Sequence, residues 1–294
     1  MNILIIGASG FLGNKAYEIF SAKYRGERKV IGTYSNHAVD NLFQLDITKQ
    51  SSFDELKKKL KQMNAMPDVI IHTAAISDVD YCELHPSDAD RINVQGTMNV
   101  IKNFDCKIIY LSTDYVFDGN KGHYSEEDKP NPINYYAKSK LDGEKAVQKH
   151  CKNHIIARVA ILYGHSMNEK KFVNWTIEQL QNKRSIRVVT DQIVTPTFID
   201  DIVYALDTLI NNDAKGIFHV AGSQAISRYD MAVETAYAFG FDKKLITPVN
   251  SSEFKQPAQR PKNTSLNINK MRNLGIKMSS FKEGIIKLKE QLGK

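Results

Sequence analysis

The chain has 294 residues, of which 42% are hydrophobic and 25% charged. These proportions are those of an ordinary folded protein and exclude a disordered, collagen-like or low-complexity chain. The formal net charge of +7 comes from lysines and arginines that are dispersed along the sequence, so we expect no nucleic-acid partner and interpret the charge as an aid to attracting an anionic ligand.

Short apolar runs alternate with longer amphipathic segments through the first half of the chain. The predicted strands cover residues 3–6, 29–34, 68–72, 107–111 and 154–159, and the predicted helices cover 11–22, 53–63, 89–103 and 135–150. Short buried strands that alternate with longer helices form βαβ units and a parallel sheet covered on both faces. The predicted fold class is therefore α/β, with a Rossmann-type doubly wound parallel sheet.

The alternation becomes irregular after about Gly164. Helices are predicted over 172–181, 199–210, 228–239 and 281–292. We therefore predict a Rossmann domain over residues 1–164 and a smaller C-terminal lobe over 165–294, with some segments of that lobe returning to the first domain.

The cysteine pattern and the hydropathy favour a cytoplasmic protein. Cys82, Cys106 and Cys151 are far apart and form no CxxC pair, so neither a disulfide framework nor a metal site is expected. The N-terminus lacks a basic leader, and no apolar run approaches the ~20 residues of a membrane helix. We expect no membrane association.

A glycine-rich turn joins the first predicted strand to the first predicted helix. The segment Gly7-Ala8-Ser9-Gly10-Phe11-Leu12-Gly13 has the spacing GxxGxxG. Glycine permits a sharp turn and lets backbone N–H groups approach a pyrophosphate at the positive end of a helix. Its place between strand and helix predicts a dinucleotide-binding site, with the C-terminal lobe holding the substrate.

The end of the second predicted strand bears on the choice of cofactor. An acid there would bond the ribose 2′-hydroxyl of NAD, but residues 33–37 read Thr-Tyr-Ser-Asn-His. Ser35 offers a hydroxyl to a 2′-phosphate, which favours NADP over NAD. Asp46 is the nearest acid, and its interpretation stays open between a contact with the adenine and a structural role, either as a solvated turn residue or as a cap of the next helix.

A strand-end threonine precedes a tyrosine–lysine pair on a predicted helix. Thr113 follows the strand over 107–111, and Tyr136 and Lys140 are four residues apart, so they share one helix face. A neighbouring ammonium lowers the tyrosine pKa from about 10 toward neutrality. The set can transfer a proton to or from a substrate oxygen during hydride transfer.

Several blocks in combination resemble the dTDP-4-dehydrorhamnose reductase family of extended short-chain dehydrogenase/reductases. They are GASGFLG, HTAA, STDYVFDG, PINYYAKSKLDGE, DQIVTPT and QRPKN. The resemblance runs from the first residue to about Gly275. The chain is also similar to the regulatory β subunit of methionine adenosyltransferase, which shares this fold.

The resemblance implies an oxidoreductase of dTDP-rhamnose biosynthesis that uses NADP or NAD and acts at a CH–OH carbon, reducing a nucleotide-linked 4-keto-6-deoxy sugar. It implies that Thr113, Tyr136 and Lys140 are catalytic, that Lys140 also bonds the nicotinamide ribose, and that Ser112 can share the role of Thr113. It places Arg260 in the nucleotide-sugar cleft, although a surface salt bridge is an equal alternative. It implies cofactor contacts from Gly7, Gly10, Phe11, Leu12, Asp46, Ile47, Ala74, Ala75 and Asn93.

The chain departs from the family at two places. The family often has glutamine at the position of Phe11. It usually has a tryptophan that lines the sugar pocket in the strand after Arg158, where this chain reads Val-Ala-Ile-Leu-Tyr-Gly. These departures leave the identity of the sugar open.

Two other functions on the same fold stay open. A nucleotide-sugar epimerase needs only the same catalytic residues and a bound cofactor, whereas a dehydratase is disfavoured because Tyr115 stands where that enzyme has a glutamate. A non-catalytic, NADP-binding regulatory subunit can keep the same motifs. The resemblance further implies a homodimer through helices 89–103 and 135–150, with Ile92, Val100 and Val147 at the interface unless they pack on the sheet.

Overall fold

The computed structural model describes residues 1–166 and 171–293. The chain divides into two compact units, each built from segments that are separate in the sequence. Unit 1 contains Met1–Thr113, Asn134–Ala157 and Asn212–Ile217, and unit 2 contains Asp114–Ile133, Arg158–Asn211 and Phe218–Lys294. The predicted boundary after Gly164 thus differs from the division in the structure, because residues 114–133 and 158–164 group with unit 2.

Unit 1 is built around a mainly parallel sheet. The strands lie in the order β11-β6-β5-β4-β1-β2-β3, and each neighbouring pair from β5 to β3 is parallel. The last residues of β6 and β11 already count with unit 2. The strands are β1 (Ile3–Ile6), β2 (Val30–Tyr34), β3 (Leu42–Gln44), β4 (Val69–His72), β5 (Lys107–Thr113), β6 (His154–Val159) and β11 (Gly216–His219).

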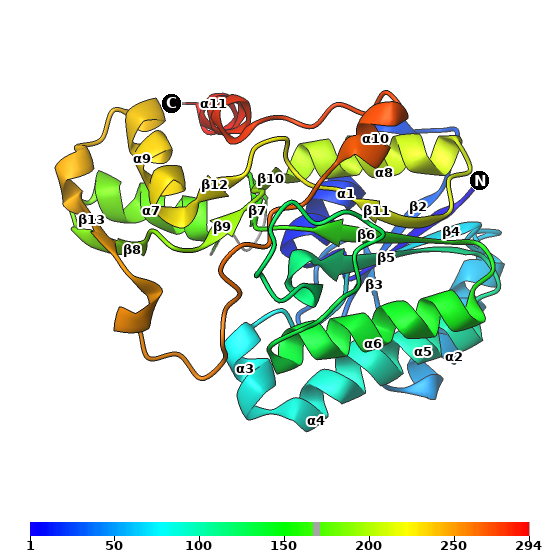
Figure 1. Cartoon of the computed structure of the whole chain (residues 1–294). Coiled ribbons are helices and arrows are strands. Elements are labelled where there is room, and N and C mark those ends of the chain that lie inside the picture. The colour runs from blue at the N-terminus through cyan, green and yellow to red at the C-terminus, as the bar shows by residue number, and fades with distance from the viewer. Residues whose placement is uncertain (167–170, 294) are drawn as a thin grey trace. The chain divides into compact units, whose positions relative to one another are not determined.

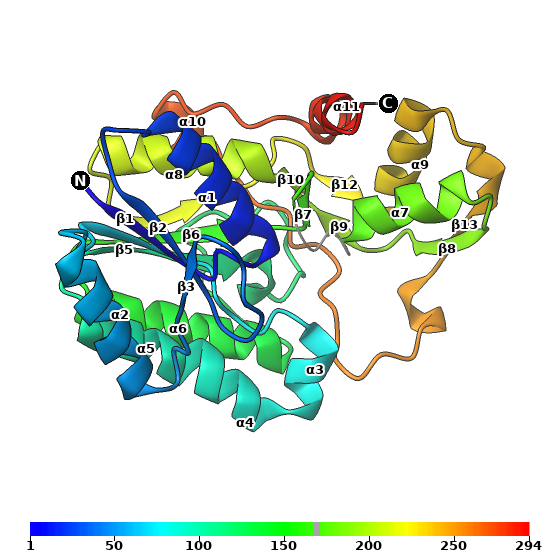
Figure 2. The same ribbon diagram turned by 180° about the vertical axis from the view of Figure 1, so that it is seen from behind.

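Helices of unit 1 lie on both faces of this sheet, with α1 on one face and α2, α5 and α6 on the other (Figures 1 and 2). β1 and β4 are buried along their whole length, as expected for strands covered on both faces. The predicted Rossmann-type doubly wound fold is confirmed. The helices are α1 (Phe11–Lys23), α2 (Gln50–Gln62), α3 (Val79–Leu84), α4 (Pro86–Ala89), the π-helix η1 (Asp90–Gly96), α5 (Thr97–Asn103) and α6 (Tyr135–His150).

The hydrophobic core between α2, α5 and the sheet explains why these segments form helices. Phe53, Leu56 and Leu60 of α2 recur at helical spacing and pack with Leu4 of β1 and Val100 of α5. The side chains of these five residues are at most 1% exposed. One face of α2 therefore supplies the core, and its lysines lie on the other face.

Unit 2 contains shorter strands in three two-stranded sheets, β7–β10, β9–β12 and β8–β13. Tyr163, Phe198 and Phe281 lie at the centre of its main core, and Leu180 and Ile246 belong to a second one. Its elements are η2 (Asp114–Val116), β7 (Leu162–Tyr163), α7 (Phe172–Gln181), β8 (Ile186–Val189), β9 (Ile193–Val194), β10 (Thr197–Phe198), α8 (Ile199–Asn211), β12 (Ile226–Ser227), α9 (Arg228–Phe239), η3 (Lys243–Leu245), β13 (Ile246–Val249), η4 (Ser251–Glu253), α10 (Asn269–Asn273) and α11 (Phe281–Gln291).

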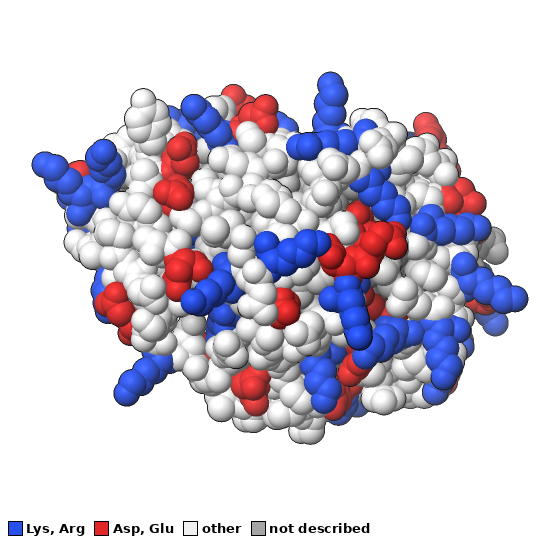
Figure 3. Space-filling view, in the orientation of Figure 1, with Lys and Arg blue, Asp and Glu red and all other residues white. Residues whose placement is uncertain are grey.

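The surface shows mixed charge. On the face drawn in Figure 3, basic and acidic side chains are interspersed rather than separated by sign. Within residues 1–166 and 171–293, no helix has the length and apolar character that crossing a membrane requires.

Candidate functional site

The glycine turn follows β1, and two of its glycines are required by the fold itself. Gly7 has a φ of +89°, and a Cβ on it would lie 2.8 Å from the backbone nitrogen of Ala74. A Cβ on Gly13 would lie 2.1 Å from the carbonyl oxygen of Gly7. A side chain at either position would therefore push α1 or the loop after β4 away from the sheet.

Gly10 differs from the other two glycines. The nearest atom to a Cβ there is the Gly7 oxygen at 3.3 Å, so packing alone tolerates a small side chain. Gly10 is the N-cap of α1, and the first turn of this helix contains no acidic residue. The positive end of α1 is thus shaped for an anion such as a pyrophosphate.

Phe11 and Leu12 open α1, and each side chain is only 7% exposed. They anchor the helix against the interior, so the cofactor contacts predicted for them would be made by the main chain. The aromatic side chain at position 11 therefore does not conflict with a nucleotide at this turn.

The ends of β1 and β4 meet where the strand order reverses. The next strand in sequence after β1 lies on one side of it, and β4 lies on the other. Ligands of open α/β sheets bind at such a switch point, beyond the carboxyl ends of the strands. Here the Ala74 N–H and the Thr73 hydroxyl donate to the Ile6 carbonyl, at 3.1 and 2.9 Å. The structure thus brings the predicted Ala74 to the glycine turn, and Ala75 is the next residue in the chain.

Ser35 and Asp46 lie near the ends of β2 and β3. Ser35 is exposed directly after β2, as a contact with a 2′-phosphate would require. Asp46 holds the turn into α2, because it accepts hydrogen bonds from the backbone and hydroxyl of Thr48, at 2.9 and 2.6 Å. Partial burial raises the pKa of Asp46, but these hydrogen bonds and Lys49 outweigh that effect and lower it. Asp46 therefore acts as a turn residue, whereas the N-cap of α2 is Lys49. The contact with the adenine stays a prediction.

Asn93 fastens the loop after β4 to α6. Its amide oxygen accepts from the Ile76 N–H at 2.9 Å, and its amide nitrogen donates to the Ser139 hydroxyl at 2.9 Å. Asn93 is 1% exposed and lies in the π-helix η1, a geometry that is frequent at functional sites. Its side chain is engaged within the protein, so its effect on a cofactor would be to shape the loop that contains Ala75. Ile47 is likewise buried and packs in the core.

Thr113 and Ser112 end β5 with different surroundings. Both are buried, at 6% and 3% exposure, but adjacent strand residues point to opposite faces. Ser112 donates its hydroxyl to Glu144 of α6 at 2.5 Å. This arrangement argues against the expectation that Ser112 can share the role of Thr113, since the Ser112 hydroxyl already bonds to the buried Glu144.

Helix α6 positions Tyr136 and Lys140. Asn134 caps it by accepting the Ala137 N–H at 2.9 Å, so the helix begins at Tyr135. Tyr135 donates its hydroxyl to Asp90 at 2.7 Å, which leaves Tyr136 as the tyrosine one turn before Lys140. This agrees with the predicted register.

Lys140 is 4% exposed, and its Nζ lies 4.0 Å from the centre of the Tyr110 ring. Burial lowers the pKa of Lys140 to about 7, although Glu144 acts in the opposite direction. Burial and Lys140 together lower the pKa of His72 to about 3, so this histidine is neutral. Perturbed lysines of this kind are common where proton transfer takes place.

Arg260 belongs to unit 2, whereas the other predicted site residues belong to unit 1. It borders a cavity of about 490 Å³, together with Asp118, Gln192 and Phe254. Its guanidinium donates to the Ala258 carbonyl at 2.7 Å. The structure therefore places Arg260 in a hollow large enough for part of a ligand.

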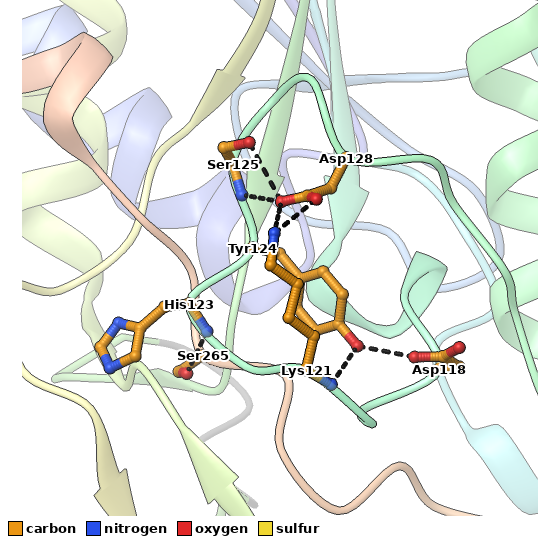
Figure 4. A network of polar contacts seen from close by, with 7 residues as sticks. All are labelled: Asp118, Lys121, His123, Tyr124, Ser125, Asp128 and Ser265. Atoms are coloured by element: carbon orange, nitrogen blue, oxygen red, sulfur yellow. Dashed lines mark hydrogen bonds and ion pairs between the residues drawn. The ribbon is translucent and has the colours of Figure 1, made fainter.

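A polar network holds the loop that brings Asp118 to this cavity (Figure 4). The Tyr124 hydroxyl donates to Asp118 at 2.6 Å, and Lys121 pairs with Asp128 at 2.5 Å. Hydrogen bonds, led by those from Tyr124 and Lys121 respectively, lower the pKa values of both carboxyls to about 2. The His123 N–H donates to Ser265 at 2.8 Å, which ties the loop to the segment after Arg260.

Sequence reasoning missed three contributors to the site. Thr33 accepts the Gly7 N–H at 3.2 Å, Thr73 bonds the end of β1, and Glu144 accepts from Ser112. Thr73 and Glu144 lie in the quoted blocks HTAA and PINYYAKSKLDGE, but the spacing of Glu144 four residues after Lys140 usually marks a surface pair.

Comparisons with known proteins agree with this geometry. The family model described as RmlD substrate binding domain matches residues 1–293. The chain is 32% identical to methionine adenosyltransferase 2 subunit beta of Mus musculus, over 96% of this chain and 85% of that protein. It is 34% identical to a dTDP-4-dehydrorhamnose reductase of Sinorhizobium fredii, over 76% of this chain and 80% of the relative. A dTDP-4-dehydrorhamnose reductase of Bacillus anthracis, solved in complex with NADP, has a TM-score of 0.87 at 30% identity and covers 99% of both chains.

Proposed function

Because the chain belongs to the RmlD substrate binding domain family, we propose that it is an NADP(H)-dependent reductase of a nucleotide-linked 4-keto-6-deoxy sugar. The relative of Sinorhizobium fredii is a dTDP-4-dehydrorhamnose reductase, which supports dTDP-4-dehydrorhamnose as the first substrate to test. The product carries a CH–OH group where the substrate has a ketone.

The observation that carries this proposal is the buried Lys140 one helical turn after Tyr136, in the same unit as the glycine turn. A lysine that only decorated a surface helix would keep its Nζ in water. Here the Nζ lies inside, against the face of Tyr110. Burial of a cation costs free energy, so a role in chemistry is the simplest reason for its position.

The residues present fit a dinucleotide. Gly10 leaves space at the positive end of α1 that packing does not require, and Ala74 and Ala75 lie at the switch point of the sheet. The exposed Ser35 and the lack of an acid in residues 33–37 favour NADP over NAD. The Bacillus anthracis relative was solved with NADP, which supports the same choice.

The proposed chemistry is a hydride transfer coupled to a proton transfer. NADPH, when bound, supplies the hydride to the keto carbon. Tyr136 donates its hydroxyl proton to the sugar oxygen as negative charge develops there. The Lys140 ammonium stabilises the tyrosinate that remains and bonds the nicotinamide ribose, and the Thr113 hydroxyl holds the sugar oxygen in place. The carbon gains a hydride and the oxygen gains a proton, so the ketone becomes an alcohol.

We propose that Arg260 binds the nucleotide sugar from unit 2. Its guanidinium borders the cavity of about 490 Å³, and arginine forms paired hydrogen bonds to phosphate oxygens. The net charge of +7 favours the approach of such an anion.

The test is a panel of nucleotide-linked 4-keto sugars, with NADPH and NADH oxidation followed by absorbance. We expect oxidation of NADPH with at least one dTDP-linked 4-keto-6-deoxy sugar, and slower oxidation of NADH. No oxidation with any sugar, together with stabilisation of a methionine adenosyltransferase catalytic subunit, would replace the proposal with the regulatory-subunit alternative. Interconversion of two nucleotide sugars without net cofactor oxidation would favour an epimerase.

A further inference from the structure

A buried carboxylate lies behind the proposed catalytic residues. Glu144 of α6 is 1% exposed, and Ser112, whose hydroxyl donates to it at 2.5 Å, is 3% exposed. A buried carboxylate costs free energy unless hydrogen bonds and opposite charge compensate it. The Ser112 hydroxyl supplies one such hydrogen bond.

Lys140 lies one helical turn before Glu144. The two residues are four apart on α6 and both are buried, so they lie on the same helix face, one turn from each other. The close approach of α6 to β5 is made by Gly143, where a Cβ would lie 2.2 Å from the Tyr110 hydroxyl oxygen. Tyr136, Lys140 and Glu144 thus form one row along the helix.

We propose that Glu144 is a positioning residue of the site, which holds Lys140 in its ammonium form while Ser112 fixes the carboxylate. The inference rests on the proposed function, because it concerns how Lys140 supports Tyr136. Glu144 would thus be a third residue of α6 that acts with Tyr136 and Lys140. The Ser112 hydroxyl at the end of β5 would hold the Glu144 carboxylate in place.

The other groups that face Lys140 do not supply this negative charge. His72 of β4 is neutral because burial lowers its pKa to about 3, and Cys82 of α3 is a neutral thiol because burial raises its pKa to about 11. Burial likewise raises the pKa of Tyr110 of β5 above its usual range. Burial lowers the pKa of Lys140 to about 7, and Glu144 is the leading group that acts in the opposite direction.

The pH dependence of kcat/KM tests this role. Glu144→Gln keeps a side chain that can accept from Ser112 but removes the charge. In this variant we expect the fall of kcat/KM at alkaline pH to begin about one pH unit lower than in the wild type. The loss of kcat/KM relative to the wild type should then grow from about twofold at pH 6 to about tenfold at pH 8. Glu144→Asp, which keeps the carboxylate, should return the alkaline fall of kcat/KM most of the way to its position in the wild type. The proposal would be overturned if the alkaline fall of kcat/KM did not move in Glu144→Gln, or if Glu144→Asp did not return it toward the wild-type position.

Asp142→Asn is the matched control. Asp142 is on the same helix, but its side chain is a third exposed and pairs with Lys145 at 2.8 Å. Asp142→Asn removes one carboxylate from α6 but leaves Tyr136, Lys140 and Glu144 unchanged. We expect its pH profile to follow the wild type, and a shift equal to that of Glu144→Gln would contradict a specific role for Glu144.

A second measurement needs neither sugar nor cofactor. Urea unfolding of Lys140→Met, Glu144→Gln and the double variant gives the coupling between the two side chains. We expect a coupling of about fivefold or more in the unfolding equilibrium constant at pH 6, which disappears at pH 9 when folded Lys140 is neutral. Absence of coupling at pH 6 would overturn the inference. A chain that shows this coupling but reduces no sugar would instead contradict the proposed function.

Discussion

The buried Lys140 ammonium lowers the stability of the fold, although the proposed chemistry requires it. Its folded pKa of about 7 lies below the usual value of about 10.4. The unfolded chain therefore binds more protons between these two values, and stability rises with pH across that window. The free-energy cost of the buried ammonium is fully present below pH 7.

Lys140→Met should remove that cost together with the activity. We expect the variant to have a higher Tm than the wild type at pH 6, because an apolar side chain replaces a buried cation. The difference should shrink as the pH rises toward 10, where lysine is neutral in both states. Thermal unfolding at pH 6 and pH 9.5 measures it, and a lower Tm at pH 6 would contradict the assigned environment.

Substitutions of two glycines of the turn should affect different properties: one lowers the stability of the fold, and the other prevents cofactor binding. Gly13→Ala forces a Cβ to 2.1 Å from the Gly7 oxygen, and overpacking of this kind costs about 1–3 kcal/mol. Gly10→Val should change the unfolding midpoint much less but abolish NADPH binding, since the side chain occupies the space at the positive end of α1. Urea unfolding and calorimetric titration with NADPH provide the two measurements. Wild-type NADPH affinity in Gly10→Val would show that the turn does not hold the cofactor.

Among the secondary-structure elements, β5 ends in two residues, Ser112 and Thr113, whose hydroxyls have different roles. Thr113→Ala should lower kcat on the keto sugar without rescue by Ser112, because Ser112 is bonded to Glu144. Ser112→Ala should leave kcat at pH 6 closer to the wild type. Steady-state kinetics of the two variants at this pH test the difference. A Thr113→Ala variant as active as the wild type would place the substrate oxygen elsewhere.

The long elements were predictable because their patterns are strong. The apolar run of β1, the glycine turn and the tyrosine–lysine spacing on α6 all agree with the structure, and α6 has the predicted bounds. β3 has three residues and the strands β7, β9, β10 and β12 have two each, too few for an alternating pattern. The predicted helix over 89–103 is in fact a π-helix followed by α5, since hydropathy does not distinguish those hydrogen-bond patterns.

The parts of the site that the sequence could not predict depend on contacts between distant residues. Asn93 reaches Ser139, 46 positions away, and no local spacing signals such a bond. Lys140 and Glu144 have the spacing of an ordinary surface ion pair. Only the packing of α6 on β5, through Gly143 and Tyr110, reveals that the pair is buried.

At the scale of the whole molecule, the predicted homodimer remains a proposal, and its interface needs revision. Val100 and Val147 are fully buried within the chain itself, and Ile92 packs against the same core as Val100. Val100 and Val147 therefore stabilise unit 1 and are not the apolar contacts of an interface, whereas Ile92 is only partly buried. We still expect dimers, and light scattering at micromolar concentration measures them; a monomer mass there would contradict the prediction.

The proposed function depends on Tyr136 as the proton donor of a reductase. The most direct test compares wild type and Tyr136→Phe in the reduction of dTDP-4-dehydrorhamnose by NADPH, with NADPH affinity measured in parallel. General acid catalysis contributes about 10²–10⁴-fold, so we predict a fall in kcat of that size with nearly unchanged NADPH affinity. Full turnover by Tyr136→Phe on a substrate that the wild type reduces would contradict the account.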